Sequence, residues 1–252
     1  MITITTDFSS REHYVGVLKG IIKSYGDIEI VDITHDVQPF DILHGAYILY
    51  NIIGYFPPDT IHVFVIDPGV GTSRKGVLAK LERGYFVGPN NGLLTFVKGM
   101  VKELYEIIAP ENVSKTFHGR DVFVPVAAKL SMGKFPENLK KIPLESIVTL
   151  NIKSPQVEKN GVIAAIIHID SFGNVITNIP ENFVKFSIGE EIFLNYHGIH
   201  KCTFRGTYGE GKEGELIMLI NSENFLEISM NKGRASDFLR ARKMDEIMIE
   251  LP

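Results

Sequence analysis

The sequence predicts an α/β protein in two parts, an N-terminal α/β domain over residues 1–152 and a C-terminal all-β domain over residues 160–252. Up to about residue 150, short β-branched runs alternate with longer segments of helical period, which indicates strand–helix–strand units around a parallel sheet. Beyond about residue 155, only short β-type runs between Gly-, Asn- and Glu-rich turns follow, which is typical of a small barrel or sandwich. The polar stretch 151–160, which contains Pro155, is the natural boundary.

The first part opens with a strand over 2–6, where β-branched residues alternate. A helix is expected from about Ser10 to Tyr25, with Ser9 or Ser10 as its cap and Gly26 at its end. The continuous apolar run 61–66 suits a strand buried on both faces. The remaining expected elements are a strand over 28–31, a helix over 41–53, and strands over 77–81 and 85–87.

The second part is expected to contain short strands only, joined by turns. They cover 162–169, 192–196, 201–204, 216–220, 226–230 and 246–251.

Composition excludes several classes of protein. The net charge of −4 comes without a basic block, so we expect no nucleic-acid partner. Cys202 is the only cysteine, which excludes an internal disulfide and a thiolate-rich metal site and predicts a buried free thiol in a reducing compartment. The N-terminus meets a charge too early for a signal peptide, and no apolar run approaches the ~20 residues of a membrane span. We therefore expect a soluble, cytoplasmic protein without a membrane partner.

Several predicted strands run directly into an aspartate, namely Asp7, Asp32, Asp67 and Asp170. Because ligands bind at the carboxyl ends of strands in open parallel sheets, the first three could line one crevice. The simpler interpretation is that these aspartates cap helices and close turns.

The segment from Asp67 to Arg74 places a carboxylate and a guanidinium at the two ends of a loop that Gly69 and Gly71 allow to turn tightly. Arg74 stands where a dinucleotide fingerprint needs its third glycine, and Val77 stands where a phosphate-binding P-loop needs its lysine. The loop is therefore neither motif. It could aim Arg74 at an anion or an oxygen nucleophile, or it could be closed by an ordinary surface ion pair.

His118 precedes Gly119, Arg120 and Asp121, and the last two could fix its imidazole. A helical run follows over 122–130, so His118 could equally be a helix cap.

The segment 170–178 contains Asp170, Phe172 and Asn174 in a turn between β-type runs. Such a group of side chains could bind a polar ligand, although Asp, Asn and Gly also form ordinary hairpin turns.

Asp7, Asp67 and His118 could supply oxygen and nitrogen ligands to a metal ion. No H-E-x-x-H, His-x-His or paired-cysteine spacing accompanies them, so we expect neither a metal nor a cofactor.

Taken together, the motifs resemble the S-adenosyl-L-methionine (SAM) hydroxide adenosyltransferases, relatives of the fluorinases and chlorinases. They occur in the family's order over nearly the whole chain. The segments are Thr6-Asp7-Phe8 with Tyr14-Val15-Gly16, Asp32-Ile-Thr-His35, Asp67-Pro-Gly-Val-Gly71, Gly88-Pro-Asn-Asn91-Gly92-Leu93, Phe117-His118-Gly-Arg-Asp121, and Asp170-Ser-Phe172-Gly-Asn174 with Thr177-Asn178-Ile179.

The resemblance implies a Rossmann-like N-terminal α/β domain and a C-terminal all-β barrel, assembled as a homotrimer with each active site between the N-domain of one subunit and the C-domain of the next. It implies that Asp7 binds the ribose hydroxyls and that Phe40 lies beside the substrate. Asp170 and Asn174 would hold the methionine end and the neighbouring ribose, and Phe172 between them would also bind substrate. Further substrate contacts are implied for Ser222 at the amino-acid end, for Glu227, and for the backbone around Met230 at the adenine.

The departures from the halogenating relatives point to the nucleophile. Those relatives have a tyrosine and a threonine at the positions of Asp67 and Val70, and a serine that contacts the halide at the position of Gly119. Here the hydrolase pattern of Asp67, Arg74 and His118 is complete instead, which implies water as the nucleophile. Glu223 stands where the fluorinase has an arginine near the substrate carboxylate, so this chain departs from the fluorinase in recognising that carboxylate.

The sequence thus predicts a hydrolase that converts SAM to adenosine and methionine, with Asp67, Arg74 and His118 activating water that attacks the ribose 5′ carbon. Three alternatives stay open: a non-catalytic SAM or adenosine sensor, a halide-dependent SAM halogenase, and a metal-dependent phosphoesterase.

Overall fold

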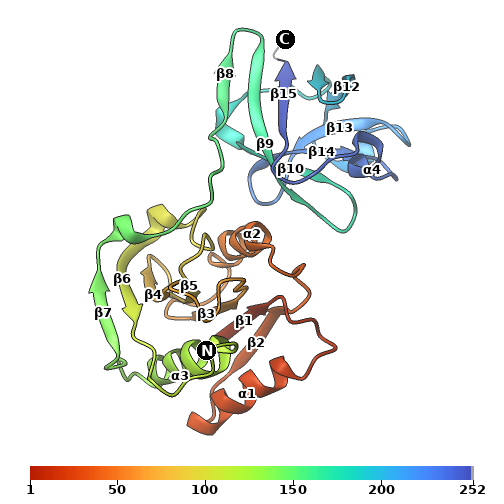
Figure 1. The fold of residues 1–252 in the computed structure, drawn as a ribbon. Coiled ribbons are helices and arrows are strands. Elements are labelled where there is room, and N and C mark those ends of the chain that lie inside the picture. Colours follow the sequence, from red (N-terminus) through yellow and green to blue (C-terminus); the bar gives the residue numbers. More distant parts are fainter. Residues whose placement is uncertain (251–252) are drawn as a thin grey trace. The chain divides into compact units, whose positions relative to one another are not determined.

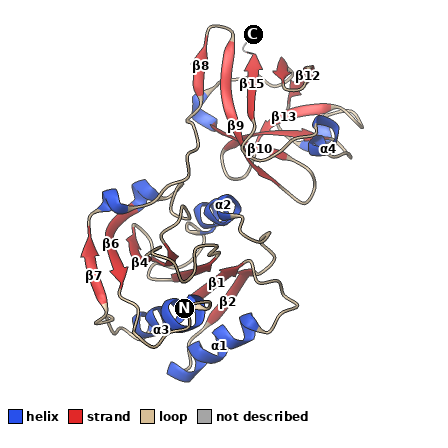
Figure 2. Cartoon of the chain, in the orientation of Figure 1, coloured by secondary structure: helices blue, strands red, loops and turns tan. Residues whose placement is uncertain are grey.

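The computed structural model describes residues 1–250 and separates into two compact units, Met1–Leu150 and a second that begins at Asn151. Figure 1 traces both units along the chain, and Figure 2 contrasts their secondary structure: the first combines helices with a sheet, whereas the second consists almost entirely of strands. This confirms the predicted fold class. The expected strand 246–251 has its last residue outside the described residues.

A seven-stranded sheet with the order β2-β1-β3-β5-β4-β6-β7 forms the first unit. Strands β1, β2, β3 and β5 run parallel, while β4, β6 and β7 are antiparallel to their neighbours. The sheet is therefore mixed, where the sequence predicted a parallel one. A three-residue turn that ends at Gly84, with φ 75°, joins β4 directly to β5 and makes that pair a hairpin. The strands are β1 Ile2–Thr6, β2 Ile30–Thr34, β3 Ile61–Val65, β4 Gly76–Leu81, β5 Tyr85–Pro89, β6 Val101–Ile107 and β7 Leu139–Ile142.

Helices cover both faces of this sheet. Helices α1 (Tyr14–Tyr25) and α3 (Val124–Ser131) lie on one face and α2 (Ile42–Ile52) on the other (Figure 1). Side chains of β3 alternate between the two hydrophobic cores: Val63 and Val65 pack with α1 and α3, whereas Phe64 packs with α2. A strand buried on both faces explains the continuous apolar run in the sequence.

Helix α1 starts later than predicted. Its N-cap is His13, which makes no side-chain capping bond, and Ser10 instead hydrogen-bonds Asp36 through its backbone N–H at 3.1 Å. The prediction of a serine cap was wrong, because Ser9 and Ser10 lie in the loop before the helix and hydrogen-bond the segment that follows β2. Gly26 ends the helix as expected.

The second unit is a closed β-barrel. Seven strands pair in the cyclic order β10-β14-β13-β12-β11-β15-β9, and β9 also pairs with β10, which closes the ring. Strand β8 pairs with the first residues of β9 and is not part of the ring. Closure removes the exposed edges that a sandwich would keep. The elements are β8 Gln156–Glu158, β9 Gly161–Ile169, β10 Val175–Pro180, β11 Glu191–Asn195, β12 Ile199–Phe204, β13 Leu216–Ile220, β14 Phe225–Met230, α4 Ala235–Leu239 and β15 Glu246–Glu250.

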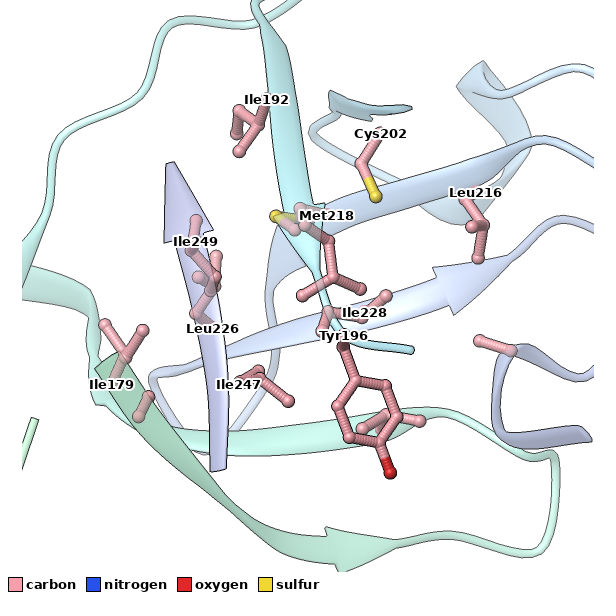
Figure 3. Packing of buried hydrophobic residues seen from close by; sticks show 14 of the residues in the cluster. Ile179, Ile192, Tyr196, Cys202, Leu216, Met218, Leu226, Ile228, Ile247 and Ile249 are labelled. Carbon is pink, nitrogen blue, oxygen red and sulfur yellow. The ribbon is translucent and has the colours of Figure 1, made fainter. Parts of the chain in front are cut away.

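Alternate side chains of these strands fill the barrel. Figure 3 shows Ile192, Met218, Ile228 and Ile249, from four different strands, directed to a common interior together with Cys202. Burial raises the pKa of the Cys202 thiol to about 12, so it is protonated and unreactive at neutral pH. The predicted buried free thiol is confirmed.

The described chain also contains short helical turns, at Lys98–Met100, Gly119–Phe123, Leu144–Ser146, Glu181–Phe183 and Tyr208–Glu210. No helix within residues 1–250 is long and apolar enough to cross a membrane.

Candidate active site

A pocket of about 240 Å³ lies at the carboxyl end of the parallel strands of the first unit, and we call it the N-domain pocket. Asp7 follows β1 and Asp67 follows β3, so the strand-end aspartates meet here as the parallel topology predicts. The pocket is lined by Asp7, Phe8, Pro39, Phe40, Val65, Asp67, Val70, Thr116, Phe117, His118 and Gly119.

Asp67, Arg74 and His118 form one hydrogen-bonded group. Arg74 Nε donates to Asp67 Oδ1 at 2.9 Å, and Arg74 Nη2 donates to Asp67 Oδ2 as well as to His118 Nδ1, the latter at 3.2 Å. The Asp67 and Arg74 side chains are only 5% and 8% exposed, so this is a buried bidentate pair and not the surface ion pair considered above. The Arg74 guanidinium also lies over the Phe123 ring, 5.4 Å from its centroid, which fixes its plane.

Gly71 explains how this group is assembled. Its φ of 76° lies in the left-handed region, and a Cβ there would stand 2.2 Å from the carbonyl oxygen of Lys115. Only a glycine at position 71 allows the loop 67–74 to lie this close to Lys115, in the segment that leads to His118. This close packing brings together the side chains of Arg74 and His118, which lie 44 positions apart in the sequence.

His118 is the N-cap residue of a single π-helical turn, Gly119–Phe123, but its side chain makes no capping bond. Turns of this kind occur frequently at functional sites. Arg120 and Asp121 pair with each other, and Asp121 Oδ2 accepts the backbone N–H of Ser114 at 2.8 Å. The idea that Arg120 or Asp121 holds the imidazole is therefore wrong, since the ring bonds Arg74.

The electrostatics of the group favour an ionisable carboxylate beside a neutral imidazole. Burial raises the pKa of Asp67, and Arg74 only partly opposes that shift. Burial, together with the charge of Arg74, lowers the pKa of His118. Because the guanidinium always donates, His118 Nδ1 must accept, which leaves the ring proton on Nε2.

Asp7 and Phe40 also line the N-domain pocket and contact each other. Asp7 Oδ2 accepts the backbone N–H of Phe40 at 2.9 Å, which helps to hold Phe40 in a left-handed conformation with φ 70°. Burial raises the pKa of Asp7, although this hydrogen bond opposes the shift. Non-glycine residues adopt this backbone region uncommonly, and such strain clusters at functional sites. The Phe40 ring is 69% exposed and is free to contact a ligand.

Asp32 does not line this pocket. It pairs instead with Lys19 of α1 and lies 3.1 Å from His35 Nε2. The reason is its position within β2, two residues before the strand ends, so its side chain does not lie at the carboxyl end of the strands, where the pocket is. The prediction of one crevice holds for Asp7 and Asp67 only.

A second pocket, of about 600 Å³, lies in the barrel unit, and we call it the barrel pocket. It contains four of the residues that the sequence predicted for substrate binding, Asp170, Phe172, Asn174 and Met230. Its lining is completed by Tyr208, Asn231, Lys232, Gly233 and Arg234.

Asp170 organises the turn that forms one wall of the barrel pocket. Its Oδ1 accepts the backbone N–H groups of Phe172 and Asn174, both at 2.9 Å, and its Oδ2 accepts Asn174 Nδ2 at 2.8 Å. Gly173 has φ 85°, and a Cβ there would meet Arg234 Cβ at 2.7 Å. The turn between β9 and β10 is thus fixed before any ligand binds, and the Phe172 ring is 74% exposed.

Glu227 and Ser222 lie outside the lining of the barrel pocket. Glu227 is buried and accepts the Tyr208 hydroxyl at 2.9 Å, so it contacts the pocket through that tyrosine. Burial raises the pKa of Glu227, and nearby Asp170 adds to the shift. Ser222 Oγ donates to Glu223 at 2.9 Å on the exposed β13–β14 turn.

Sequence reasoning missed several residues of both pockets. Phe8 and Phe117 stand next to Asp7 and His118 in the sequence, so adjacency could have indicated them; their rings pack edge to face, with centroids 5.6 Å apart. Tyr208 lies in a short helical turn without a local motif, and no pattern in the sequence distinguishes it.

Among residues 1–250, no three His, Cys, Asp or Glu side chains are grouped as a metal site requires. Asp67, Arg74 and the neutral His118 instead form a group of side chains that suits the activation of an oxygen nucleophile.

Comparison with known proteins shows the family of the chain. Residues 2–140 match the SAM hydroxide adenosyltransferase N-terminal domain, and residues 164–248 match the C-terminal domain of the same family. An (R)-S-adenosyl-L-methionine hydrolase from Methanocaldococcus jannaschii is 42% identical, in an alignment that covers 99% of this chain and 95% of that protein.

A fluorinase from Actinopolyspora mzabensis is 25% identical over 92% of this chain and 90% of its own. Among solved structures, an uncharacterised conserved protein from Thermotoga maritima superposes with a TM-score of 0.88 at 39% identity, with both chains fully covered.

Proposed function

Since the chain belongs to the SAM hydroxide adenosyltransferase family, we propose that it hydrolyses SAM to adenosine and L-methionine. The single observation that carries the proposal is the buried group of Asp67, Arg74 and His118 at the edge of the N-domain pocket. The resemblance noted from the sequence is confirmed by the family match and by full-length relatives that are named SAM hydrolases.

The protein does not need to protonate the leaving group in this reaction. The sulfonium of SAM departs as a neutral thioether when water attacks the ribose 5′ carbon, so the C5′–S bond breaks with no proton supplied. The new C5′–O bond requires that the water lose a proton. Catalysis therefore depends on positioning the water and on a base.

We assign the proton to Asp67, a choice that the sequence left open between Asp67 and His118. His118 Nδ1 faces the Arg74 guanidinium, so Nε2 carries a hydrogen and has no lone pair for a proton of water. The two oxygens of Asp67 have four lone pairs between them; Arg74 uses two and the Gly69 N–H uses one, so one remains for a proton of water. In this scheme His118 Nε2 donates to the water oxygen and orients it, and Arg74 stabilises the developing hydroxide.

The remaining residues are assigned to substrate binding. In the N-domain pocket, Asp7 binds the ribose hydroxyls and Phe40 lies beside the substrate. In the barrel pocket, Asp170, Phe172 and Asn174 hold the methionine end and the neighbouring ribose, and the backbone near Met230 contacts the adenine. Ser222 and Glu227 contribute from the β13–β14 region. Support comes from the two pockets, which contain most of these side chains.

The proposed assembly is a homotrimer in which the N-domain pocket of one subunit and the barrel pocket of the next form one active site. Exposed Phe40 and Phe172 in the two pockets suit surfaces that substrate and partner cover. Mixing an Arg74→Ala variant with an Asp170→Asn variant tests the arrangement, provided that activity is measured at SAM concentrations far below KM, where both variants are impaired. Shared sites predict recovery of activity in mixed trimers, whereas sites within one chain predict none.

Product analysis tests the function itself. The name of the M. jannaschii relative specifies the (R) form, so we expect purified protein to convert (R)-SAM to adenosine and methionine faster than the (S) epimer. Chelator and chloride should leave the products unchanged. Tight binding without turnover would indicate a sensor, chloroadenosine a halogenase, and loss of activity in chelator a metal-dependent enzyme.

A further inference from the structure

We propose that Asn91 is a positioning residue for this reaction: its side-chain amide fixes the main chain at Ile66 and thereby the direction of the Asp67 carboxylate. The role in catalysis rests on the proposed function. Asn91 Nδ2 donates to the carbonyl oxygen of Ile66 at 2.9 Å, and Ile66 directly precedes Asp67. Asn91 lies two residues after the end of β5, in the segment 88–93, to which the proposed mechanism assigns no role.

The hydrogen bond acts where the sheet stops holding the chain. The pairing of β3 with β1 ends at Val65, and its pairing with β5 ends at Val63. Ile66 is the first residue beyond both ladders, and the loop that carries Asp67 begins there. Without a partner for its carbonyl, the peptide between Ile66 and Asp67 could rotate, and the aspartate side chain would turn with it.

The Ile66 side chain is held independently of that carbonyl. It is fully buried, and a Cβ on Gly45 of α2 would stand 2.4 Å from its Cδ1 and 2.6 Å from Leu93 Cδ2. Packing therefore fixes where Ile66 sits, while Asn91 fixes how its peptide is oriented. Loss of Asn91 should thus change geometry at Asp67 more than it changes the core.

The Asn91 amide is also incompletely satisfied. Its Oδ1 is buried and has no hydrogen-bond partner among the described residues 1–250. A buried acceptor without a partner costs free energy, and such exceptions call for an explanation. Placement of a donor at the Ile66 carbonyl provides one, since local rules are broken most often at functional sites.

Its neighbour Asn90 supplies a matched control. Asn90 Nδ2 donates to the carbonyl of Ser146 at 2.8 Å, and its Oδ1 accepts the Val148 N–H at 2.9 Å. Asn90 thus makes the same kind of side-chain bond to a carbonyl. Its partners lie in the segment 146–148, which does not line the N-domain pocket.

The experiment compares Asn91→Ala with Asn90→Ala by kinetics, thermal unfolding and NMR of the arginine Nε–H groups. Both variants should lower Tm. Asn91→Ala should lower kcat about 10- to 100-fold with KM changed less than threefold, since small misplacements of reacting groups have effects of this size. Asn90→Ala should keep kcat within threefold of wild type. Asn91→Gln, which retains an amide donor, should restore part of kcat, and it replaces Asn91→Ala if that variant does not fold.

The NMR signal reports position without turnover. Arg74 Nε–H bonds Asp67 Oδ1, so its signal, assigned by its loss in Arg74→Lys, should shift in Asn91→Ala and stay in Asn90→Ala. If wild-type protein makes no adenosine, the proposed function fails while this signal still tests the positioning. Equal kcat in the two alanine variants, a change in KM alone, or an unmoved Arg74 signal in Asn91→Ala would overturn the proposal.

Discussion

The N-domain pocket and the barrel pocket each contain an aspartate that is followed, a few residues later, by a glycine with positive φ: Asp67 with Gly71, and Asp170 with Gly173. The two carboxylates nevertheless have different surroundings. Both oxygens of Asp67 are bonded by the Arg74 guanidinium, and the same guanidinium bonds His118. Among the described residues, the Asp170 carboxylate bonds only its own turn, through the N–H groups of Phe172 and Asn174 and the Asn174 amide. In the proposed mechanism the first arrangement changes its protonation state, whereas the second presents a fixed binding surface. We therefore expect the N-domain pocket to set kcat and the barrel pocket to set KM.

The largest combined loss of activity and stability is expected for Arg74→Ala. The substitution removes a donor from both Asp67 and His118 and leaves the carboxylate buried without its counter-charge. Loss of one such donor lowers kcat by about 10²–10³, and breaking a buried ion pair costs about 3–5 kcal/mol of stability. Steady-state kinetics and denaturant unfolding measure the two losses.

Arg74→Lys is the control, because lysine keeps the charge but cannot donate in the bidentate geometry. It should retain more stability than Arg74→Ala while kcat stays low. If Arg74→Ala raised KM and left kcat unchanged, the division between the pockets would be wrong.

The pH dependence of kcat separates Asp67 from His118. A base must be ionised, and burial raises the pKa of Asp67 above its usual range, so activity should be full above that pKa and lost as pH falls through it. Asp67→Asn should lower kcat about 10²–10⁴-fold and flatten this acidic limb. His118→Asn, whose side-chain oxygen can still accept from Arg74, should keep the limb at a reduced rate. An acidic limb that disappears only in His118→Asn would make His118 the base.

A smaller effect, on KM alone, is expected for Asp170→Asn. Loss of a charge-assisted hydrogen bond to the substrate is worth about 1.5–3 kcal/mol, which raises KM roughly tenfold to a hundredfold. The control combines Asp170→Asn with Asn174→Asp, which can restore the side-chain bond between the two positions. A fall in kcat with unchanged KM would show that the barrel pocket takes part in the chemical step.

The smallest effect is expected for Ser222→Ala. Its hydroxyl donates to Glu223 on an exposed turn outside the lining of the barrel pocket, so at most one exposed hydrogen bond to substrate is lost. KM should rise about twofold to tenfold, consistent with about 0.5–1.5 kcal/mol for such a bond. A hundredfold rise in KM would instead place Ser222 at the centre of substrate recognition.

Much of the fold was predictable where local pattern and tertiary structure agree. The run 61–66 is apolar on both faces because β3 is buried on both faces, and Gly26 ends α1 where the pattern ends. Strand β6 was missed because Val101, Leu104 and Ile107 are its buried residues, and a spacing of three resembles a helix. Pairing with β4 and β7 decides that segment, and no local signal reports those partners.

The site was predictable to a different extent. Motifs indicated Asp67 and His118 separately, and only the family resemblance joined them. The two residues come together because Gly71 packs closely against the Lys115 carbonyl, and the spacing of residues in the sequence does not predict this contact. The tautomer of His118 likewise follows from the position of Arg74 Nη2 in space. Asp32 shares its strand-end signal with Asp67 and still lies outside the pocket, because that signal does not say how far a strand extends.

Incorporation of oxygen-18 tests the central claim most directly. Protein incubated with (R)-SAM in oxygen-18 water should release adenosine that carries the label in its 5′ hydroxyl, because the attacking oxygen comes from water held by Asp67, Arg74 and His118. Under the same conditions, methionine should be released in equal amount and without label. Unlabelled adenosine, or no adenosine at all, would contradict the account.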